Sequence, residues 1–414
     1  MIPISVAALE SLGLGEFSGS LSDEVTGLEI DSRRVRPGDL FVAIRGGRAF
    51  LEDARNVGAT TLVPSDEFAA MAVIGEVLRA RSTARFVGIT GSTGKTSTKD
   101  ILAALCAPVA HTVATERSNN AELGVPLTLG KLELDTEICI VEMGMRGFGQ
   151  ITELCKIARP DVGVITAIGP VHLELVGSVD GVARSKAELI AALPIGGIAV
   201  VPESVELDPY LRDDIDVRKV GPVDVELRDG GAHVAFGGGR IRFPLTSRHQ
   251  AQNALTAMTT YEALGLPLDR LAEGAAEVEL SPWRGEELPL PGGGFVVNDA
   301  YNANPTSMEA ALRHLAERGA GHRLVAILGG MAELGEYTER HHRELAEVAD
   351  ELGIEVIAVG DVARAYGVDA WAPDADAALE TARALIVPGD AVLVKASRSV
   401  ALEGIAPALA NLPT

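Results

Sequence analysis

The residues best suited to chemistry lie in a glycine-rich stretch between an apolar run and a helical pattern. The stretch reads Thr90-Gly91-Ser92-Thr93-Gly94-Lys95-Thr96-Ser97 and follows a strand expected over residues 85–90. Small residues let backbone N–H groups surround phosphate oxygens, and the positive end of the following helix points toward them. Lys95 is placed to reach the terminal phosphates, and the Thr96 hydroxyl to bind Mg²⁺. The pattern therefore predicts a site for a nucleoside triphosphate.

One position departs from the strict phosphate-loop pattern, which has a glycine where this chain has Ile89. The reaction class therefore stays open at this point, and a glycine-rich turn without a ligand is the alternative. A switch protein that hydrolyses nucleotide is a second alternative. A GTPase of that kind is expected to carry Asn-Lys-x-Asp, and the sequence has no Asn-Lys dipeptide.

Three further side chains suited to metal chemistry follow other expected elements. Glu142 ends the apolar run 138–141, and a carboxylate at the carboxyl end of a sheet strand can bind Mg²⁺. His172 follows the strand expected over 162–166, and Lys186 is placed at the start of a helix. Addition of CO₂ to a neutral Lys186 amine would give an anionic carbamate, which binds Mg²⁺ as a carboxylate does. A solvated acid, a structural histidine and a salt-bridged lysine are the ordinary alternatives.

Polar residues also follow three expected strands in the last third of the chain. These strands cover 295–298, 324–328 and 391–395. Three such loops in one domain favour a binding face, because the carboxyl ends of parallel strands meet at one edge of the sheet. The candidate residues in two of these loops are Asp299, Tyr301, Asn302, Asn304, Ser397 and Arg398.

Composition limits the partners of this chain. It has 414 residues, with 36 basic against 58 acidic side chains and a formal net charge of −22. Because nucleic acids and anionic membranes bind basic surfaces, the acidic excess argues against both. The sequence shows neither a signal peptide nor an apolar run of membrane-spanning length, so we expect a soluble cytoplasmic protein. The three cysteines (Cys106, Cys139 and Cys155) form no C-x-x-C pair and are expected to be buried and reduced.

Strand and helix patterns divide the chain into three expected α/β domains, over residues 1–82, 83–284 and 285–414. The middle domain alternates β-branched runs with helices, as in a buried parallel sheet, and includes an antiparallel patch over 223–243. A segment rich in proline and glycine, 281–294, separates it from a third domain in which the alternation restarts.

Taken together, these motifs resemble those of the Mur ligases of bacterial cell-wall synthesis over nearly the whole chain. Residues 90–96 match the T-G-S-x-G-K-T loop of that family, and 31–43 resembles its uridine-nucleotide domain. The stretch 298–305 with Ser307-Met308 is most similar to the D-alanyl-D-alanine-adding branch. The Asp-Asn-Pro-Arg tetrapeptide expected of the diaminopimelate-adding branch is absent.

The resemblance implies a fold and a set of roles. It implies a small N-terminal domain that binds the uridine nucleotide, a central P-loop ATPase domain and a Rossmann-like C-terminal domain that binds the acceptor and closes. The implied cofactors are ATP and Mg²⁺, and Lys95 would act on the ATP phosphates. The metal ligands implied are Thr96, Glu142, His172 and a carbamylated Lys186. Asn253 is implied at the adenine, Arg284 at phosphate, and Asp299 at the ribose or in the magnesium shell. The residues implied to bind the substrates are Ser32, Arg33, Asn120, Tyr301, Asn302, Asn304, Ser397 and Arg398.

The implied reaction joins D-alanyl-D-alanine to UDP-N-acetylmuramoyl-tripeptide. A substrate carboxylate attacks the γ-phosphate of ATP, and the D-alanyl-D-alanine amine then displaces phosphate from the acyl phosphate. We expect a monomer. The alternatives are a diaminopimelate- or lysine-adding Mur ligase, a ligase similar to folylpolyglutamate synthetase, and a binding protein that has lost catalysis.

Four features depart from the family pattern. Gly330 stands where the family usually has Asp, Ala396 where it has Gly, and Gln250 where Asn is common. The segment 46–50 is shorter than expected and lacks the usual Gly-His. The last departure bears on recognition of the uridine nucleotide and leaves the ATP chemistry unchanged.

Overall fold

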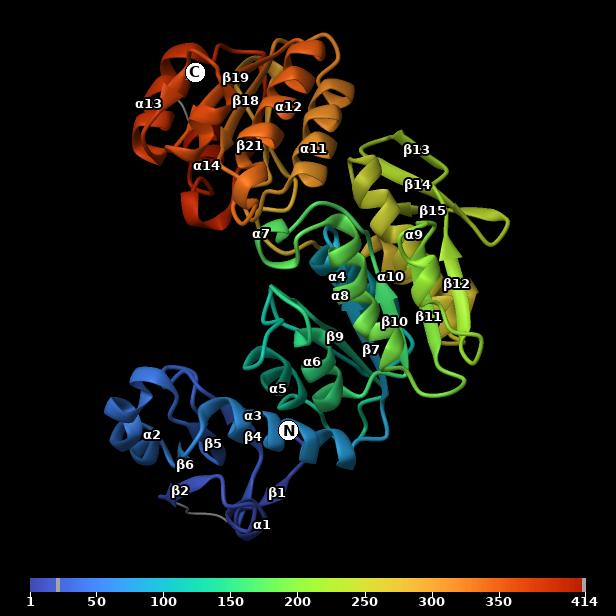
Figure 1. Cartoon of the computed structure of the whole chain (residues 1–414), viewed down its shortest axis with the longest axis vertical. Helices are drawn as coiled ribbons and strands as arrows, with labels where there is room; N and C mark the ends of the chain where they lie inside the picture. Colours follow the sequence, from blue (N-terminus) through green and yellow to red (C-terminus); the bar gives the residue numbers. More distant parts are fainter. Residues whose placement is uncertain (20–22, 412–414) are drawn as a thin grey trace.

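The computed structural model describes residues 1–19 and 23–411, which form three α/β parts that follow one another along the chain. Figure 1 shows the N-terminal part (blue) and the C-terminal part (orange to red) at opposite ends of the long axis, with the middle part between them. The α/β class and the three-part architecture expected from the sequence are confirmed. The domain boundaries near 82 and 285 stay predictions.

The N-terminal part has a mixed sheet of order β2-β6-β5-β4 and a separate antiparallel pair, β1 with β3. Its longest helix, α3, buries Met71, Ile74 and Leu78 along one face, as an amphipathic period requires. This face packs in a core shared with helices of the middle part, so it attaches the two parts to each other. The elements are β1 (Ile4–Ser5), α1 (Val6–Glu10), β2 (Gly15–Ser18), β3 (Glu24–Val25), β4 (Gly27–Glu29), β5 (Asp39–Val42), α2 (Leu51–Val57), β6 (Thr60–Pro64) and α3 (Glu67–Arg81).

The middle part is built on a parallel sheet of order β12-β11-β10-β7-β9-β8. The strands are β7 (Arg85–Thr90), β8 (Thr112–Ala114), β9 (Ile138–Glu142), β10 (Val162–Ile165), β11 (Ile198–Pro202) and β12 (Asp216–Val220). Successive residues of β7 point to opposite faces of the sheet. Val87 and Ile89 pack with α4 and α9, while Phe86 packs on the other side with α6. The sheet is therefore buried on both faces, as its continuous apolar runs predict.

The helices of the middle part are α4 (Lys95–Cys106), α5 (Gly124–Leu129), α6 (Gln150–Ala158), α7 (Leu173–Val176), α8 (Val179–Ala191), α9 (Arg248–Ala263) and α10 (Leu271–Ala276). The expected antiparallel patch is present as β13 (Val225–Arg228), β14 (Gly231–Phe236) and β15 (Gly239–Phe243), and it packs on α9. All three cysteines are buried and free, as predicted.

The C-terminal part has a sheet of order β16-β17-β21-β18-β19-β20, in which only the edge strand β16 runs antiparallel. Helices cover both faces of this sheet, and each face has its own apolar core. The elements are β16 (Glu286–Pro289), β17 (Phe295–Asn298), α11 (Pro305–Arg318), β18 (Leu324–Gly329), α12 (Thr338–Glu351), β19 (Ile354–Val359), β20 (Trp371–Ala372), α13 (Ala375–Leu385), β21 (Ala391–Lys395) and α14 (Ile405–Ala410).

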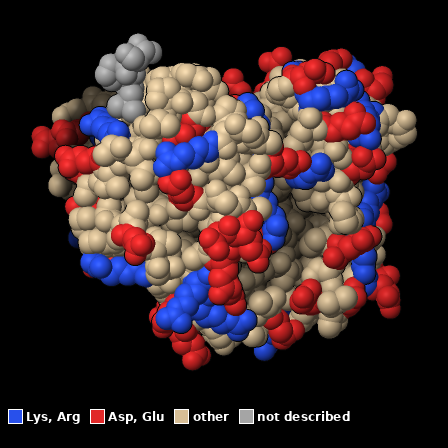
Figure 2. All heavy atoms as spheres, turned by 90° about the horizontal axis from the view of Figure 1, so that it is seen from above, with Lys and Arg blue, Asp and Glu red and all other residues tan. Residues whose placement is uncertain are grey.

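Acidic and basic side chains are interspersed over the face seen in Figure 2, which shows no extended basic area. Within residues 1–19 and 23–411, no helix combines the length and the apolar character needed to cross a bilayer.

Candidate active site

The glycine-rich stretch lies where the strand order of the middle sheet reverses. β8 and β9 lie on one side of β7, and β10, β11 and β12 lie on the other. The loops that follow β7, β9 and β10 therefore open at the same edge, which is where open α/β sheets bind ligands. This topology brings the loop before Lys95 next to the strand end at Glu142 and the loop that carries His172.

Two glycines in this stretch have no tolerable substitute. Gly91 has φ +150°, and a Cβ there would lie 1.9 Å from the Thr166 hydroxyl. Gly94 has φ +79°, and a Cβ there would lie 2.2 Å from Oδ1 of Asn253. Positive φ and close approach both require glycine. The loop is therefore fixed between the strand end of β10 and the second turn of α9.

Lys95 begins α4, and its Nζ donates a hydrogen bond of 2.7 Å to the carbonyl oxygen of Gly91. This contact folds the side chain back over the loop, where it lines a cavity. Burial lowers the pKa of Lys95, and the charge of Arg284 lowers it further, while Glu142 acts in the opposite sense. The charge of Glu142 offsets only part of this lowering of the pKa. A phosphate bound at this position would supply further negative charge beside Lys95.

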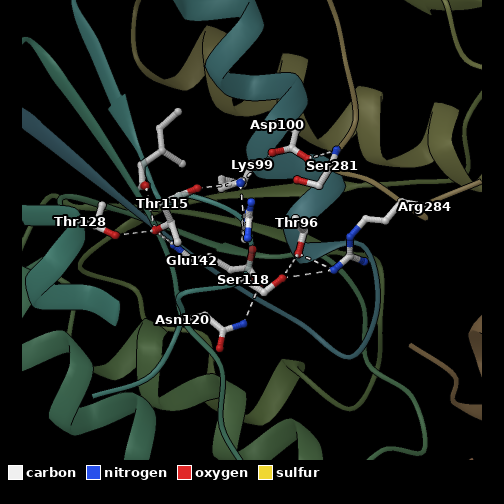
Figure 3. Close-up of polar contacts among 12 residues, drawn as sticks. Thr96, Lys99, Asp100, Thr115, Ser118, Asn120, Thr128, Glu142, Ser281 and Arg284 are labelled. Carbon is white, nitrogen blue, oxygen red and sulfur yellow. Dashed lines mark hydrogen bonds and ion pairs between the residues drawn. The ribbon is translucent and has the colours of Figure 1, made fainter. Parts of the chain in front are cut away.

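Figure 3 shows Thr96 together with two residues that approach it from other segments, Ser118 and Arg284. Nη2 of Arg284 donates to Oγ1 of Thr96 at 2.8 Å and lies 3.5 Å from Oγ of Ser118. Nε of Arg284 is buried and has no partner within the described residues. An unpaired buried guanidinium donor is costly, and an anionic ligand in the cavity would satisfy it.

Glu142 presents one free carboxylate oxygen at the same place. Its Oε1 accepts a hydrogen bond of 2.7 Å from Asn120, and its backbone N–H donates to the Thr115 hydroxyl at 3.0 Å. Oε2 is buried and lacks a hydrogen-bond partner among the described residues. A buried carboxylate oxygen is expected to be paired or to bind a cation. Glu142 and Thr96 thus form a donor set that fits a divalent cation of the Mg²⁺ type.

A buried ion pair in α4 joins three segments, as Figure 3 shows. Nζ of Lys99 lies 2.7 Å from Oδ1 of Asp100 and donates to the carbonyl oxygens of Thr115, at 2.7 Å, and Arg117, at 3.2 Å. Oδ2 of Asp100 accepts a hydrogen bond of 2.8 Å from the backbone N–H of Ser281. The first turns of α4 therefore hold both the loop that carries Ser118 and Asn120 and the segment that leads to Arg284.

His172 and Lys186 lie on the side of β7 opposite to Glu142. Lys186 is only 2% exposed and lies in the middle of α8, so its prediction at a helix start is wrong. The reason is that Ser178 caps this helix well before Lys186. Burial lowers the pKa of the Lys186 amine well below its ordinary value, and the charge of Lys95 adds to the effect. The neutral amine is the form that reacts with CO₂.

The ring of His172 contacts a residue that the sequence did not single out. Its Nδ1 is hydrogen-bonded to the carboxylate of Glu333, which belongs to the C-terminal part. Burial lowers the pKa of His172, Glu333 opposes this shift, and the charges of Lys186 and Lys95 act with burial.

A cavity of about 540 Å³ lies between the phosphate loop and the strand ends of the C-terminal sheet. Asp299 pairs with Lys395 at 2.5 Å, and the ring of Tyr301 lies 4.2 Å from the guanidinium of Arg284. The cavity therefore joins the two parts of the chain. The predicted residues in its wall are Ser92, Thr93, Gly94, Lys95, Thr96, Ser97, Asn120, Glu142, Asn253, Arg284, Asp299, Tyr301, Asn302 and Asn304.

Within the described part of the chain, four predicted substrate residues do not line this cavity: Ser32, Arg33, Ser397 and Arg398. Arg33 forms an exposed ion pair of 2.7 Å with Asp31 in the N-terminal part. Ser397 is buried and accepts a hydrogen bond of 3.0 Å from the N–H of Ala332, so it holds the loop after β18. Arg398 packs on the ring of Trp283, with 4.6 Å between the guanidinium carbon and the ring centre.

Sequence reasoning missed several side chains that lie at or beside the site, among them Ser118, Arg146, Glu333 and Lys395. Lys395 carried a usable signal, since lysine is scarce in this chain and this one ends an apolar strand. Glu333 lies in one of the three polar loops expected after strands of the last third, although it was not singled out there. Ser118 and Arg146 lie in loops whose course depends on tertiary packing, and neither spacing nor residue type marks them.

Comparison with known families identifies the family of this chain. Residues 89–261 match the Mur ligase middle domain, and residues 284–398 match the family described as Mur ligase, glutamate ligase domain. Similarity to curated members extends over nearly the whole chain. The chain therefore belongs to the Mur ligase family, and the resemblance inferred from the motifs is confirmed.

Several similar curated relatives share one name. UDP-N-acetylmuramoyl-tripeptide--D-alanyl-D-alanine ligase of Escherichia coli is 31% identical, with 99% of each chain covered. The protein of the same name from Mycobacterium tuberculosis is 32% identical, with 99% of this chain and 98% of that protein covered. Among solved structures, MurF from Acinetobacter baumannii has a TM-score of 0.85 at 26% identity, with 99% of each chain covered.

Two other solved structures extend the comparison. MurF from Thermotoga maritima in complex with ADP has a TM-score of 0.82 at 26% identity, with 93% of this chain and 97% of that chain covered. Folylpolyglutamate synthase from Mycobacterium tuberculosis, complexed with ADP and AMPPCP, has a TM-score of 0.66 at 20% identity and covers 84% of this chain and 96% of its own. That last likeness concerns the fold alone.

Proposed function

We propose that this chain is an ATP-dependent ligase that joins D-alanyl-D-alanine to UDP-N-acetylmuramoyl-tripeptide, with release of ADP and phosphate. The curated relatives that match over their whole length carry that name. The observation that carries the proposal is the cavity between the phosphate loop and the loop after β17. One wall of this cavity suits ATP, and the other presents polar groups to a second substrate.

In the first step the terminal carboxylate of the tripeptide attacks the γ-phosphate of ATP. Two anions must approach each other, so the site has to offset their repulsion. Lys95 and Arg284 both line the cavity next to the phosphate loop and supply fixed positive charge there. The unpaired Nε of Arg284 supports a role at phosphate, and Asn253, on α9 against Gly94, is assigned to the adenine side.

Mg²⁺ would be held by Thr96 and Glu142 and, at a second position, by His172 with a carbamylated Lys186. The free oxygen of Glu142 fits the first assignment, and the buried amine of Lys186, whose pKa burial lowers well below its ordinary value, fits the second. Bound Mg²⁺ would neutralise phosphate charge during transfer. Asn120 holds the other oxygen of Glu142 through a hydrogen bond of 2.7 Å, so it fixes the orientation of the carboxylate.

In the second step the amine of D-alanyl-D-alanine attacks the acyl phosphate and phosphate leaves. We assign the acceptor to the face formed by Tyr301, Asn302 and Asn304, with Asp299 directed by Lys395. Exclusion of water by the docked C-terminal part would protect the acyl phosphate from hydrolysis. Ser397 and Arg398 border this face from the loop after β21.

The N-terminal part, with Ser32 and Arg33, is assigned to the uridine nucleotide. We further propose that the enzyme is a monomer that acts in the cytoplasm, in synthesis of peptidoglycan precursors. Residues 1–82, 83–284 and 285–414 are the domains proposed for the nucleotide-linked substrate, for ATP and for the acceptor.

The test is an assay of ADP release with UDP-N-acetylmuramoyl-tripeptide and a panel of amines. We expect turnover with D-alanyl-D-alanine and none with lysine or meso-diaminopimelate. Turnover with either amino acid on the matching shorter precursor, and none with D-alanyl-D-alanine, would contradict the proposal. Lys95→Met serves as the control, because it should abolish ADP release with every amine.

A further inference from the structure

The contact between His172 and Glu333 joins two parts of the chain at the proposed metal site. His172 lies between β10 and α7, and Glu333 lies in the loop after β18. Nδ1 of the imidazole is hydrogen-bonded to the Glu333 carboxylate, and both side chains are partly buried, with 25% of the His172 and 35% of the Glu333 side chain exposed. In Figure 1, α7 lies at the end of the middle part next to the C-terminal part.

Both residues have a backbone conformation that non-glycine residues rarely adopt. His172 has φ +52° and Glu333 has φ +62°. Left-handed backbone at non-glycine positions costs free energy and persists where the surroundings enforce it, often at functional sites. Its occurrence at both partners of one contact indicates that the fold is arranged to bring these two side chains together.

Further contacts fix the loop of Glu333 on α7. The backbone N–H of Glu174 is directed at the carbonyl oxygen of Glu333, at 3.5 Å. A Cβ on Gly335 would lie 3.2 Å from Cβ of Glu174, and Tyr337 packs on the apolar core that contains Leu173. These contacts hold the loop that carries the Glu333 carboxylate against α7.

The hydrogen bond to Glu333 determines which ring nitrogen of His172 carries the proton. An ionised carboxylate accepts hydrogen bonds and cannot donate one, so the ring proton of neutral His172 resides on Nδ1. The lone pair then lies on Nε2, which is left free to bind a metal. Histidines that ligate metals commonly donate their other N–H to a carboxylate in this way, and the carboxylate sets both tautomer and ring orientation.

We propose that Glu333 is a positioning residue that prepares His172 for Mg²⁺ through this hydrogen bond. Because Glu333 belongs to the C-terminal part, the second metal site is complete only when that part is docked on α7. The same C-terminal part carries the proposed acceptor face. Its docking therefore brings that face into place and completes the metal site at the same time. The inference rests on the proposed function, in which His172 is a metal ligand.

The experiment measures Mn²⁺ affinity by electron paramagnetic resonance, with a non-hydrolysable ATP analogue present and no turnover. Variants Glu333→Ala, Glu333→Gln and His172→Ala are compared with the control Glu336→Ala, an exposed acid of the same loop. We expect Glu333→Ala to weaken the second Mn²⁺ by about 10- to 100-fold. Glu333→Gln keeps an acceptor and should lose less, and Glu336→Ala should bind as the unaltered protein does.

A second measurement reads the tautomer directly. In long-range ¹H–¹⁵N spectra, His172 should be the Nδ1–H tautomer in the unaltered protein and in Glu336→Ala, and a mixture of tautomers in Glu333→Ala. Thermal unfolding of each variant shows whether it is folded.

The outcomes separate the inference from the proposed function. If His172→Ala weakens Mn²⁺ binding and Glu333→Ala does not, the role of Glu333 is refuted while the metal assignment stands. If His172→Ala leaves both Mn²⁺ affinities unchanged, the metal assignment of the proposed function fails. An unchanged Nδ1–H tautomer in folded Glu333→Ala would also overturn the inference.

Discussion

The ion pair between Lys99 and Asp100 should contribute more to stability than any exposed pair of this chain. The Lys99 and Asp100 side chains are 4% and 12% exposed, and their charged atoms lie 2.7 Å apart. Removal of one partner from a buried pair costs about 3–5 kcal/mol, because the other charge stays buried. Lys99 keeps two carbonyl acceptors in Asp100→Ala, so we expect the lower end, about 3 kcal/mol of unfolding free energy.

Asp100→Ala should also lower activity, because it loosens the segment that leads to Arg284. Asp100 accepts the backbone N–H of Ser281, and Arg284, which contacts Thr96, follows in the same segment. Loss of this anchor lets Arg284 shift, and a displacement of about 1 Å in a positioning group can cost up to about a hundredfold in rate. Asp100→Asn keeps an oxygen acceptor for Ser281, so its kcat should fall less than that of Asp100→Ala.

The assays are urea unfolding followed by circular dichroism and ADP release at saturating substrates. Glu153→Ala is the matched control, because Glu153 pairs with Lys156 at 2.6 Å while both side chains are more than half exposed. Such a surface pair is worth about 0.5 kcal/mol or less. The reasoning is refuted if Asp100→Ala costs no more stability than Glu153→Ala, or if both Asp100 variants keep full kcat.

Three other predictions test separate parts of the site. Lys186→Ala should abolish synthesis, and added short-chain carboxylic acids should restore part of it if a carbamate acts there; ADP release unaffected by such acids would speak against the carbamate. Gly94→Ala should prevent ATP binding, measured by calorimetry, because the added Cβ would lie 2.2 Å from Asn253. The double variant Gly94→Ala with Asn253→Ala should recover part of the affinity. No recovery would show that the positive φ of Gly94 alone accounts for the loss of binding. Burial lowers the pKa of His249 to about 4, so the folded state disfavours the charged ring, and stability should fall as pH drops from about 6.5 toward 4. Between pH 7 and pH 5 this amounts to about 2 kcal/mol, and His249→Gln should remove that share of the pH dependence measured by urea unfolding.

Much of the fold could be predicted because its signals are local. The apolar spacing over 68–81 predicts a helix, and α3 covers Glu67–Arg81. The β-branched run at 162–166 predicts a buried strand, and β10 covers Val162–Ile165. Helix and strand periods are set by side chains a few residues apart, so the sequence carries them directly.

Lys186 shows where this reasoning fails. Residue type and neighbours favoured a helix start, with a solvated or salt-bridged amine as the ordinary alternative, whereas the structure places the amine in the buried interior of α8. The capping residue Ser178 and the packing of α8 on the sheet decide this position. Neither is visible in the few residues around Lys186, since burial depends on elements that lie far away in the sequence.

The glycine-rich stretch illustrates the division between sequence and tertiary structure. The sequence by itself was enough to predict a phosphate-binding loop, because glycines, a lysine and a threonine at fixed spacing act within a single turn. Only the tertiary structure decided what surrounds the loop: Arg284 from the linker, Asn253 from α9 and Asp299 with Lys395 from the last sheet. The pairing of His172 with Glu333 is of the same kind. Such contacts arise from strand order and from the packing of one part of the chain on another, and the spacing of residues along the chain does not encode them locally.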